Sequence, residues 1–493
     1  MRKKRYYLIG IAGVAMASLA GLLKKKGHEV VGSDQDVYPP MSDMLKSLKI
    51  PVFKPYNVFH MKRHKPDIVV IGNAIGRGNP ELEYVISNGL PYRSMSDILR
   101  EEFIAWPSKP WRSRQQRKAI VIAGTHGKTT TTAIVAWILE TAGFDPSIFV
   151  GGFMRNINST FKLGKGKYVV LEGDEYDTAF FDKGPKFWHY RPFIGLVNNI
   201  ELDHIDIYKD LDAIKFAFGR FINLIPQNGL LVVSRENQNA YTLSQKMAKS
   251  PIATYGVKSG DYKAKNIKFT DGYISFDVHY NGHLPDSKAG VLSDIRTKLI
   301  GKYNISNILG AIAIVKFLKI PDVKIKNAIA TFEGVKRRQE IIGEKNGITV
   351  IDDYAHHPTA VRLTLDAVRQ RFPAYAKASA DKHKKRRIVC IFEPGSASSK
   401  RRVFEKQYIE SFKHADLVYL YKPFNAQSLQ KRETFNGKYV SQMLHKNGVL
   451  ASNFENIDKM LFHMKQHVKP RDVICIMSCR GFDGLYKQIW DIL

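Results

Sequence analysis

The chain has 493 residues, more than a single hydrophobic core normally serves, so several domains are expected. Its apolar content of 44% and charged content of 25% are ordinary for a globular protein, and three cysteines are too few for a disulfide-stapled secreted protein. The net charge of +30 is large, but the basic residues are scattered and form no recognisable reading helix. We therefore expect a basic surface that attracts phosphate-bearing small molecules, and no nucleic-acid partner.

The first stretch, MRKKRYYLIGIAGVAMASLAGLL, permits two interpretations. A basic start followed by an uncharged run is typical of a secretion signal. The same residues also predict a buried strand at 6–11, a glycine turn and a helix at 16–27. Asp34 then closes a second strand, 24 residues beyond Gly10. That spacing is typical of a nucleotide-binding βαβ unit, and we prefer this interpretation because cleavage would remove the first strand of the sheet.

Short apolar strands alternate with helices along most of the chain, which predicts open, mainly parallel α/β sheets. A loop at 70–83 follows one such strand and is polar and rich in glycine, as ligand-binding loops of these sheets are. Segments 274–282 and 291–300 are predicted to be antiparallel strands on the flank of the middle region. Breaks at 106–118 and 331–338 separate the regions, and 373–387 is predicted to be a solvated surface excursion.

A phosphate-binding loop is predicted at 123–131, where the sequence reads AGTHGKTTT. The loop follows an apolar strand and opens an apolar helix, so its backbone N–H groups and the helix N-terminus can stabilise phosphate charge. Lys128 can reach the β- and γ-phosphates, and the Thr129 hydroxyl can bind Mg²⁺. The loop is shorter than the usual consensus, but strand, loop and helix all agree.

Two acidic segments, EGDEYD (172–177) and NNIELDHID (198–206), each follow an apolar strand directly. Carboxylates gathered at strand ends need charge compensation, and Mg²⁺ bound together with ATP supplies it. His204 lies between Asp203 and Asp206, so we expect it to bind the metal or to support a ligand.

Six segments occur in the order found in the Mur ligases, the ATP-dependent amide ligases of peptidoglycan assembly: GTHGKTTT, EGDEYD, NNIELDHID, GKYNISN (301–307), FEGVKRRQE (332–340) and DDYAHHPTA (352–360). Further stretches resemble the murein peptide ligases, one branch of that family: SDQDVYPPMSDML (33–45), GNAIGRGNPELE (72–83), EYDTAFFDKGPKFWHY (175–190), EPGSASSKRRVF (393–404) and MSCRGFDG (477–484). The resemblance covers essentially the whole chain.

This resemblance implies three α/β domains. An N-terminal Rossmann-like domain at 1–112 is expected to bind UDP-N-acetylmuramate. A central P-loop ATPase-like domain at 113–331, with a flanking small sheet, is expected to bind ATP. A C-terminal Rossmann-like domain at 332–493 is expected to bind the peptide or amine substrate.

The resemblance also implies the reaction. The ligase is expected to use ATP and Mg²⁺ to join L-Ala-γ-D-Glu-meso-diaminopimelate to UDP-N-acetylmuramate through an acyl phosphate, in peptidoglycan recycling. The alternative is a UDP-N-acetylmuramate–L-alanine ligase. We expect a cytoplasmic enzyme without stable membrane insertion, a monomer or a weak homo-oligomer. An inactive UDP-sugar sensor and a nucleic-acid-binding P-loop protein are alternatives from other classes.

Site residues follow from the same resemblance. The expected catalytic residues are Lys128, Glu172, His204 and Arg337. The expected nucleotide-binding residues are Gly124, Thr125, His126, Gly127, Lys128, Thr129, Thr130, Asn304, Asn307, Arg337, Asp352 and His356. Those expected to bind the UDP-sugar are Gly10, Ala12, Gly13, Val14, Ala15, Met16, Asp34, Asn73 and Asn79, and the metal ligands are Thr129, Glu172 and His204.

Three positions, Tyr303, Gly173 and Gly395, depart from the family pattern, and Gly173 in place of the usual Ala is expected to be harmless. Tyr303 stands where the family usually has His, so that residue's role in ATP binding is not carried over. Gly395 stands where relatives usually carry an Arg suited to a substrate carboxylate, so peptide recognition is expected to differ. Lys215 is the nearest candidate for a carbamylated lysine, but it follows His204 too closely, and we do not assign it that role.

Overall fold

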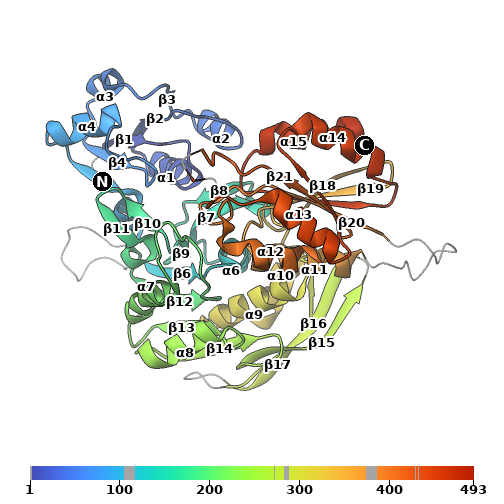
Figure 1. Cartoon of the computed structure of the whole chain (residues 1–493). Helices are drawn as coiled ribbons and strands as arrows, with labels where there is room; N and C mark the ends of the chain where they lie inside the picture. The colour runs from blue at the N-terminus through green and yellow to red at the C-terminus, as the bar shows by residue number, and fades with distance from the viewer. Residues whose placement is uncertain are drawn as a thin grey trace.

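The computed structural model describes residues 3–104, 117–270, 272–282, 288–372, 386–427, 429–430 and 432–493. Three large sheets, formed within residues 5–94, 118–297 and 340–477, each carry helices packed against them, as Figure 1 shows. We call these parts the first, central and third domains. The architecture is the three-part α/β arrangement predicted from the sequence. The predicted linker at 106–118 and the predicted excursion at 373–387 fall almost entirely outside the described residues.

The first domain is a five-stranded parallel sheet in the order β3-β2-β1-β4-β5. The predicted first strand and helix form β1 and α1, and β1 lies in the middle of the sheet. The order reverses between β1 and β4, so the loops after these two strands meet at the edge where such sheets bind ligands. The elements are β1 (Arg5–Ile9), α1 (Val14–Lys25), β2 (Glu29–Ser33), α2 (Met41–Ser47), β3 (Val52–Phe53), α3 (Val58–His64), β4 (Ile68–Ile71), α4 (Pro80–Ser87), β5 (Tyr92–Ser94) and α5 (Met95–Leu99), followed by a π-helical turn (Arg100–Ile104).

The central domain has a ten-stranded sheet in the order β17-β16-β15-β14-β13-β12-β6-β9-β7-β8. Strands β15, β16 and β17 pair antiparallel on its flank, as predicted, and β15 joins the parallel part by pairing with β14. The strands are β6 (Lys118–Ala123), β7 (Ser147–Met154), β8 (Ser159–Lys162), β9 (Tyr168–Gly173), β12 (Pro192–Val197), β13 (Leu230–Ser234), β14 (Ile252–Gly256), β15 (Tyr262–Thr270), β16 (Tyr273–Tyr280) and β17 (Gly290–Thr297), with a separate hairpin of β10 (Asp177–Ala179) and β11 (Asp182–Pro185). The helices are α6 (Lys128–Thr141), α7 (Leu211–Asn223), α8 (Gln238–Met247), α9 (Lys302–Phe317) and α10 (Asp322–Thr331).

The third domain has a six-stranded sheet in the order β18-β19-β23-β20-β21-β22, in which only β18 runs antiparallel to its neighbour. Because β23 lies between β19 and β20, the loops after these three strands share one edge of the sheet. The elements are β18 (Glu340–Lys345), β19 (Ile348–Asp353), α11 (Pro358–Arg371), β20 (Ile388–Phe392), α12 (Glu405–Phe412), β21 (Leu417–Tyr421), α13 (Gly437–Lys446), β22 (Leu450–Phe454), α14 (Ile457–His467), β23 (Val473–Met477) and α15 (Leu485–Ile492).

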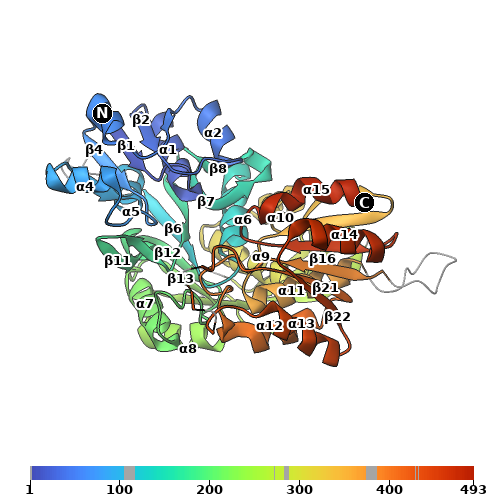
Figure 2. The same ribbon diagram turned by 45° about the horizontal axis from the view of Figure 1, so that its top comes forward.

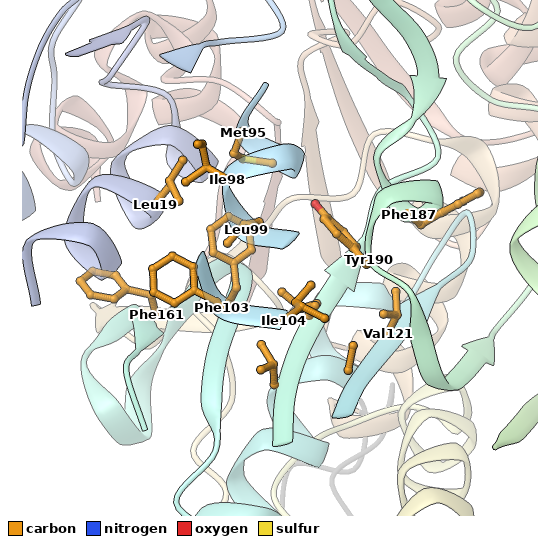
Figure 3. Packing of buried hydrophobic residues seen from close by; sticks show 14 of the residues in the cluster. Leu19, Met95, Ile98, Leu99, Phe103, Ile104, Val121, Phe161, Phe187 and Tyr190 are labelled. Carbon is orange, nitrogen blue, oxygen red and sulfur yellow. The ribbon is translucent and has the colours of Figure 1, made fainter. Parts of the chain in front are cut away.

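The first and central domains share one hydrophobic core, which Figure 3 shows from close by. Leu19 of α1 and Leu99 of α5 belong to the same buried cluster as Phe161 of β8 and Tyr190. The contact is tight, because a Cβ atom on Gly21 would lie 2.1 Å from the Phe161 ring. These two domains therefore pack as one body.

The third domain docks on the central domain next to α9 and α10, and both views place it there (Figures 1 and 2). The N-terminus of α9 packs closely on α11, since a Cβ atom on Gly301 would lie 2.6 Å from the Cβ of Ala367. Other contacts are polar: Thr359 Oγ1 donates a hydrogen bond to Glu201 Oε2 at 2.7 Å. Among the described helices, none combines the length and the apolar character needed to cross a membrane.

Candidate active site

The predicted phosphate loop lies between β6 and α6. Gly124 and Gly127 have φ angles of +136° and +80°, a region that glycine adopts without strain. A Cβ atom on Gly127 would also lie 2.6 Å from Asn307 Oδ1, so this loop requires glycine for space as well. The free N–H groups at the start of α6 face the loop, which makes it an anion-binding site.

Lys128 stands at the first position of α6 and is held by acceptors on two sides. Its Nζ donates to Gly124 O at 2.7 Å and to the two carboxylate oxygens of Glu175 at 3.0 and 2.8 Å. Burial opposes the charge of Lys128, but the carboxylates around it, Glu175 foremost, raise its pKa. Glu175 lies within the acidic segment 172–177 but is not among the predicted site residues, because spacing alone does not reveal which carboxylate reaches the lysine.

Glu172, at the end of β9, contacts Thr129, the other residue expected to bind the metal. Thr129 Oγ1 donates to Glu172 Oε1 at 2.8 Å, and Gly151 N donates to Oε2 at 2.7 Å. Burial and the nearby charge of Asp174 raise the pKa of Glu172, so its ionised form lacks enough positive charge around it. A hydroxyl and a carboxylate that need a cation, beside a phosphate loop, form a donor set suited to Mg²⁺.

His204 approaches this cluster through Glu175. Its Nε2 lies 3.3 Å from Glu175 Oε1, and its backbone adopts a φ of +49°. Burial opposes protonation, but contact with Glu175 and the charge of Asp203 raise the pKa of His204. The structure therefore brings Lys128, Glu175 and His204 into one buried network, with His204 paired to a carboxylate in this conformation.

The asparagines predicted to contact nucleotide lie on α9, with Asn307 against the loop. Asn307 Nδ2 donates to Asn304 Oδ1 at 3.1 Å, and Asn304 Nδ2 donates to Ile300 O at 2.8 Å. Tyr303, on the same first turn, is partly buried beside the third domain, where the charge of Asp353 acts on its hydroxyl. Tyr303 therefore lies where the third domain meets α9, a position that the departure from His did not reveal.

Arg337 stays a predicted nucleotide-binding residue, but the arginine that contacts the phosphate loop in this structure is its neighbour, Arg338. Arg338 Nη2 donates to Thr129 Oγ1 at 3.2 Å. Arg337 instead bonds within the third domain, to Asp352 Oδ2 at 3.2 Å and Ser478 O at 2.7 Å. The reason is local backbone geometry: φ is +60° at Arg337 and +52° at Gln339, so adjacent side chains leave the chain in different directions.

Asp352 and His356 lie in the third domain near this junction. Asp352 pairs with Arg337 and accepts from Tyr486 at 2.8 Å, yet burial raises its pKa to about 6. His356 Nδ1 lies 3.0 Å from Tyr354 O, and Asp203 of the central domain is among the charges acting on the His356 ring. Burial lowers the pKa of His356, which favours the neutral ring.

The predicted UDP-sugar loop of the first domain has the expected turn. Gly10 has a φ of +82°, and Ala12 N donates to Asp34 Oδ2 at 2.8 Å, which ties the loop to the end of β2. Two of the residues predicted to bind the UDP-sugar make contacts within the protein that the sequence did not indicate. Met16 is buried in the shared core, and Asn79 Oδ1 caps α4 by accepting from Glu81 N at 3.0 Å.

The remaining residues predicted to bind the UDP-sugar differ in their exposure to solvent. Gly13, Val14 and Asn73 are exposed, and Ala15 is half-buried. These residues surround the point where the loops after β1 and β4 meet, since a Cβ atom on Gly10 would lie 3.3 Å from Ile75.

The aromatic stretch at 180–190 and Lys215, both singled out in the sequence, contact residues outside the phosphate loop. Phe181 contacts Tyr92 of the first domain with ring centroids 5.1 Å apart, and Trp188 Nε1 donates to Ala217 O of α7 at 2.9 Å. The aromatic stretch thus joins domains and contributes to the core. Lys215, on α7, pairs with Asp212 at 3.7 Å, and no contact connects it to the phosphate loop among the described residues.

The three parts of the chain each match a known domain. Residues 5–105 match the Mur ligase family catalytic domain, 122–315 the Mur ligase middle domain, and 337–480 the Mur ligase glutamate ligase domain. The chain belongs to the Mur ligase family. Members of this family are ATP-dependent ligases that form amide bonds.

Named relatives of this Mur ligase fall into two groups. The UDP-N-acetylmuramate–L-alanyl-γ-D-glutamyl-meso-2,6-diaminoheptandioate ligase of Escherichia coli is 34% identical over 99% of this chain and 98% of its own. The UDP-N-acetylmuramate–L-alanine ligase of Clostridium acetobutylicum is 35% identical over 96% of this chain and 94% of its own. The crystal structure of a murein peptide ligase from Psychrobacter arcticus superposes with a TM-score of 0.72, at 32% identity over 99% of this chain and 98% of that one. The chain is thus similar to both groups along its whole length.

Proposed function

We propose that this Mur ligase joins L-Ala-γ-D-Glu-meso-diaminopimelate to UDP-N-acetylmuramate in peptidoglycan recycling, with ATP and Mg²⁺, in the cytoplasm. In this proposal the first domain (1–112) holds the UDP-sugar, the central domain (113–331) holds ATP, and the third domain (332–493) holds the tripeptide. Relatives that use the tripeptide and relatives that use L-alanine are similarly identical to the chain, so the choice of acceptor rests on the third domain.

The observation that favours the tripeptide as the amine substrate is a pair of cations. They lie at the edge of the third sheet where its parallel strands end. The stem of Arg480 occupies the space beside Gly395, where an added Cβ atom would lie 2.9 Å from Arg480 Cγ, and Arg480 Nε donates to Gly395 O at 3.3 Å. Its guanidinium lies 5.3 Å from the centroid of the Phe424 ring, and Lys400 Nζ donates to the next residue, Asn425 O, at 3.5 Å. Two cations therefore converge on one short segment.

Neither of these two cations forms an ion pair with the described residues. In the described part of the chain, no carboxylate oxygen lies within 4.0 Å of the side-chain nitrogens of Lys400 or Arg480. The tripeptide carries three free carboxylates, whereas L-alanine carries one, so a paired cationic site suits the tripeptide better. Gly395, the departure noted in the sequence, leaves room for an arginine supplied by the loop after β23.

The residues of the central domain fit the expected chemistry. The lactyl carboxylate attacks the γ-phosphorus of ATP, ADP leaves, and an acyl phosphate forms. The peptide amine then attacks the acyl carbon and forms the amide, with release of phosphate and a proton. Lys128 and Arg338 are placed to offset the charge on the transferring phosphoryl group, so positioning and electrostatics supply most of the catalysis.

Mg²⁺ would be held by Thr129 and Glu172, with His204 as a further candidate. The fit rests on the raised pKa of the buried Glu172, a carboxylate that lacks sufficient compensation within the protein. A bound Mg²⁺ would neutralise the oxygens of the β- and γ-phosphates. His204 now pairs with Glu175, so its contribution requires that this pair separate.

The test is phosphate release with ATP, Mg²⁺ and UDP-N-acetylmuramate, with either the tripeptide or L-alanine added. We expect turnover with the tripeptide, and an Arg480→Ala variant that raises its KM about tenfold or more while kcat changes less. Gln430→Ala, on the nearby surface, serves as a matched control that keeps the KM. Turnover with L-alanine alone would assign the chain to the second group of relatives instead.

A further inference from the structure

A second cluster of metal-ligating side chains lies between the central and third domains. His126 comes from the phosphate loop, Glu201 from the segment after β12, and His357 from the cap of α11. One ligand atom from each of the three lies within 4.8 Å of the other two. His126 Nε2 is 3.4 Å from Glu201 Oε2, and the centroids of the two imidazole rings are 4.6 Å apart.

The cluster has an unused donor atom at its centre and supporting contacts around it. His126 Nε2 is buried without a hydrogen-bond partner, although it faces the Glu201 carboxylate. Thr359 Oγ1 donates to Glu201 Oε2 at 2.7 Å. His357 Nδ1 accepts from Thr359 N at 3.3 Å and His357 Nε2 lies 3.2 Å from Leu202 O, so a metal bound by His357 would replace one of these two contacts. Such surrounding contacts orient metal ligands in known sites.

The donor atoms distinguish this cluster from the site proposed for Mg²⁺. Mg²⁺ prefers oxygen ligands and retains several waters, whereas two imidazoles and one carboxylate suit zinc-like transition metals.

We propose that His126, Glu201 and His357 form a second cation site, which takes a zinc-like transition metal and links the third domain to the central domain. Tetrahedral ligands with bonds of about 2.0–2.2 Å lie roughly 3.4 Å apart, so the widest pair here must approach by about 1.4 Å at most. The three residues leave a fourth position for water. A metal held there would fix the third domain in its docked position, because its ligands come from both sides of the junction.

The test uses Co²⁺ as the probe, because it replaces zinc in such sites and its visible absorption reports tetrahedral nitrogen and oxygen ligands. The full-length protein, without nucleotide, is titrated and monitored by absorbance and by calorimetry. We expect one Co²⁺ bound with a tetrahedral spectrum. His357→Asn retains a good helix cap and Glu201→Gln retains an acceptor for Thr359, yet each should weaken this binding about tenfold or more.

A third variant separates this site from the proposed Mg²⁺ site. His204→Asn removes the candidate ligand of the other cluster and should leave the tetrahedral Co²⁺ spectrum unchanged. Circular dichroism of the metal-free variants verifies that each is folded. Equal Co²⁺ affinity and spectrum in the wild type and His357→Asn would overturn the proposal, as would loss of the spectrum in His204→Asn. Neither outcome bears on the acceptor, because the experiment contains no UDP-sugar and no ATP.

Discussion

Two buried charged clusters in this Mur ligase differ in how completely they are compensated. In the first domain, the Glu102 carboxylate accepts from Lys4 Nζ at 2.8 Å, Lys26 Nζ at 2.6 Å and Tyr6 Oη at 2.9 Å. His28 lies 3.6 Å away. Burial opposes the negative charge of Glu102, but these neighbours hold the pKa of the Glu102 carboxyl far below its usual range. Its surroundings hold more positive charge than one carboxylate needs.

The cluster around Lys128 has the opposite balance. Its carboxylates include Glu172, Glu175 and Asp203, and the groups that face them are the Lys128 ammonium and the His204 ring, whose pKa is raised. Glu175 and Asp203 have lowered pKa values, whereas that of Glu172 is raised. A buried carboxylate whose charge is balanced by neighbouring cations stabilises the fold. A buried carboxylate with too little positive charge around it can still bind a cation.

The largest expected effect tests the catalytic side of this comparison. Lys128→Ala removes the cation closest to the phosphate loop, and we expect turnover to fall by roughly 10³-fold or more, because charge stabilisation dominates phosphoryl transfer. Phosphate release measures the loss, and calorimetry should show unchanged binding of UDP-N-acetylmuramate. Near-normal turnover would contradict the role given to Lys128. Lys183→Ala, on the exposed hairpin, is the matched control and should retain turnover.

The two adjacent arginines allow a narrower test. Arg338 contacts Thr129, so Arg338→Ala should lower kcat by about 10²-fold, the size of effect seen when one donor to a developing charge is lost. Arg337 is satisfied inside the third domain, so Arg337→Ala should lower kcat less and lower the unfolding midpoint of that domain more. Kinetics and urea unfolding of both variants show which arginine contributes more to kcat. A larger loss of kcat in Arg337→Ala would favour Arg337, the residue predicted from the sequence.

Glu102→Gln should destabilise the fold by about 3 kcal/mol at pH 7, since it leaves two partly buried lysines without their carboxylate. The folded-state pKa of Glu102 is lowered, so its stabilisation is present above the unfolded pKa of about 4.3 and declines as the pH falls toward the folded value. Urea unfolding of both proteins at pH 7 and near pH 4 should therefore show a shrinking difference. A constant difference would contradict the electrostatic origin.

The smallest expected effect is a gain in stability, in contrast to the loss expected for Glu102→Gln. The folded-state pKa of Glu172 is raised, so the ionised carboxylate lowers stability at pH 7, and this cost disappears below the unfolded pKa. Glu172→Gln can still accept from Gly151 N, and should stabilise the metal-free protein by about 1 kcal/mol. Unfolding in EDTA measures this gain. Added Mg²⁺ and ATP should stabilise the wild type more than the variant, and destabilisation in EDTA would contradict the prediction.

Much of the site could be predicted because its signals are local. A strand, the loop at 123–131 and a helix adjoin in sequence, so the phosphate loop follows from their order. The acidic strand ends follow from the same reasoning, because parallel strands bring their carboxyl ends to one edge.

The residues that were missed depend on geometry that the sequence does not encode locally. Arg337 and Arg338 are chemically identical neighbours, and only the positive φ angles around them decide which faces Thr129. Glu175 meets Lys128 across two strand ends, and Asn79 looks like a ligand until its helix cap is seen. Arg480 becomes a candidate only when its contact with Gly395 places both residues at one sheet edge.

The core shared by α1 and β8 has a consequence for synthesis on the ribosome. Ser18 contacts Thr160 at 2.6 Å, and Phe161 covers Gly21, so residues 142 positions apart complete each other's environment. The first sheet finishes at Ser94, well before β8 emerges from the ribosome. Until then α1 exposes an apolar face that α2 and α5 cover only in part. The burial of this face is therefore completed only when the central domain has been synthesised.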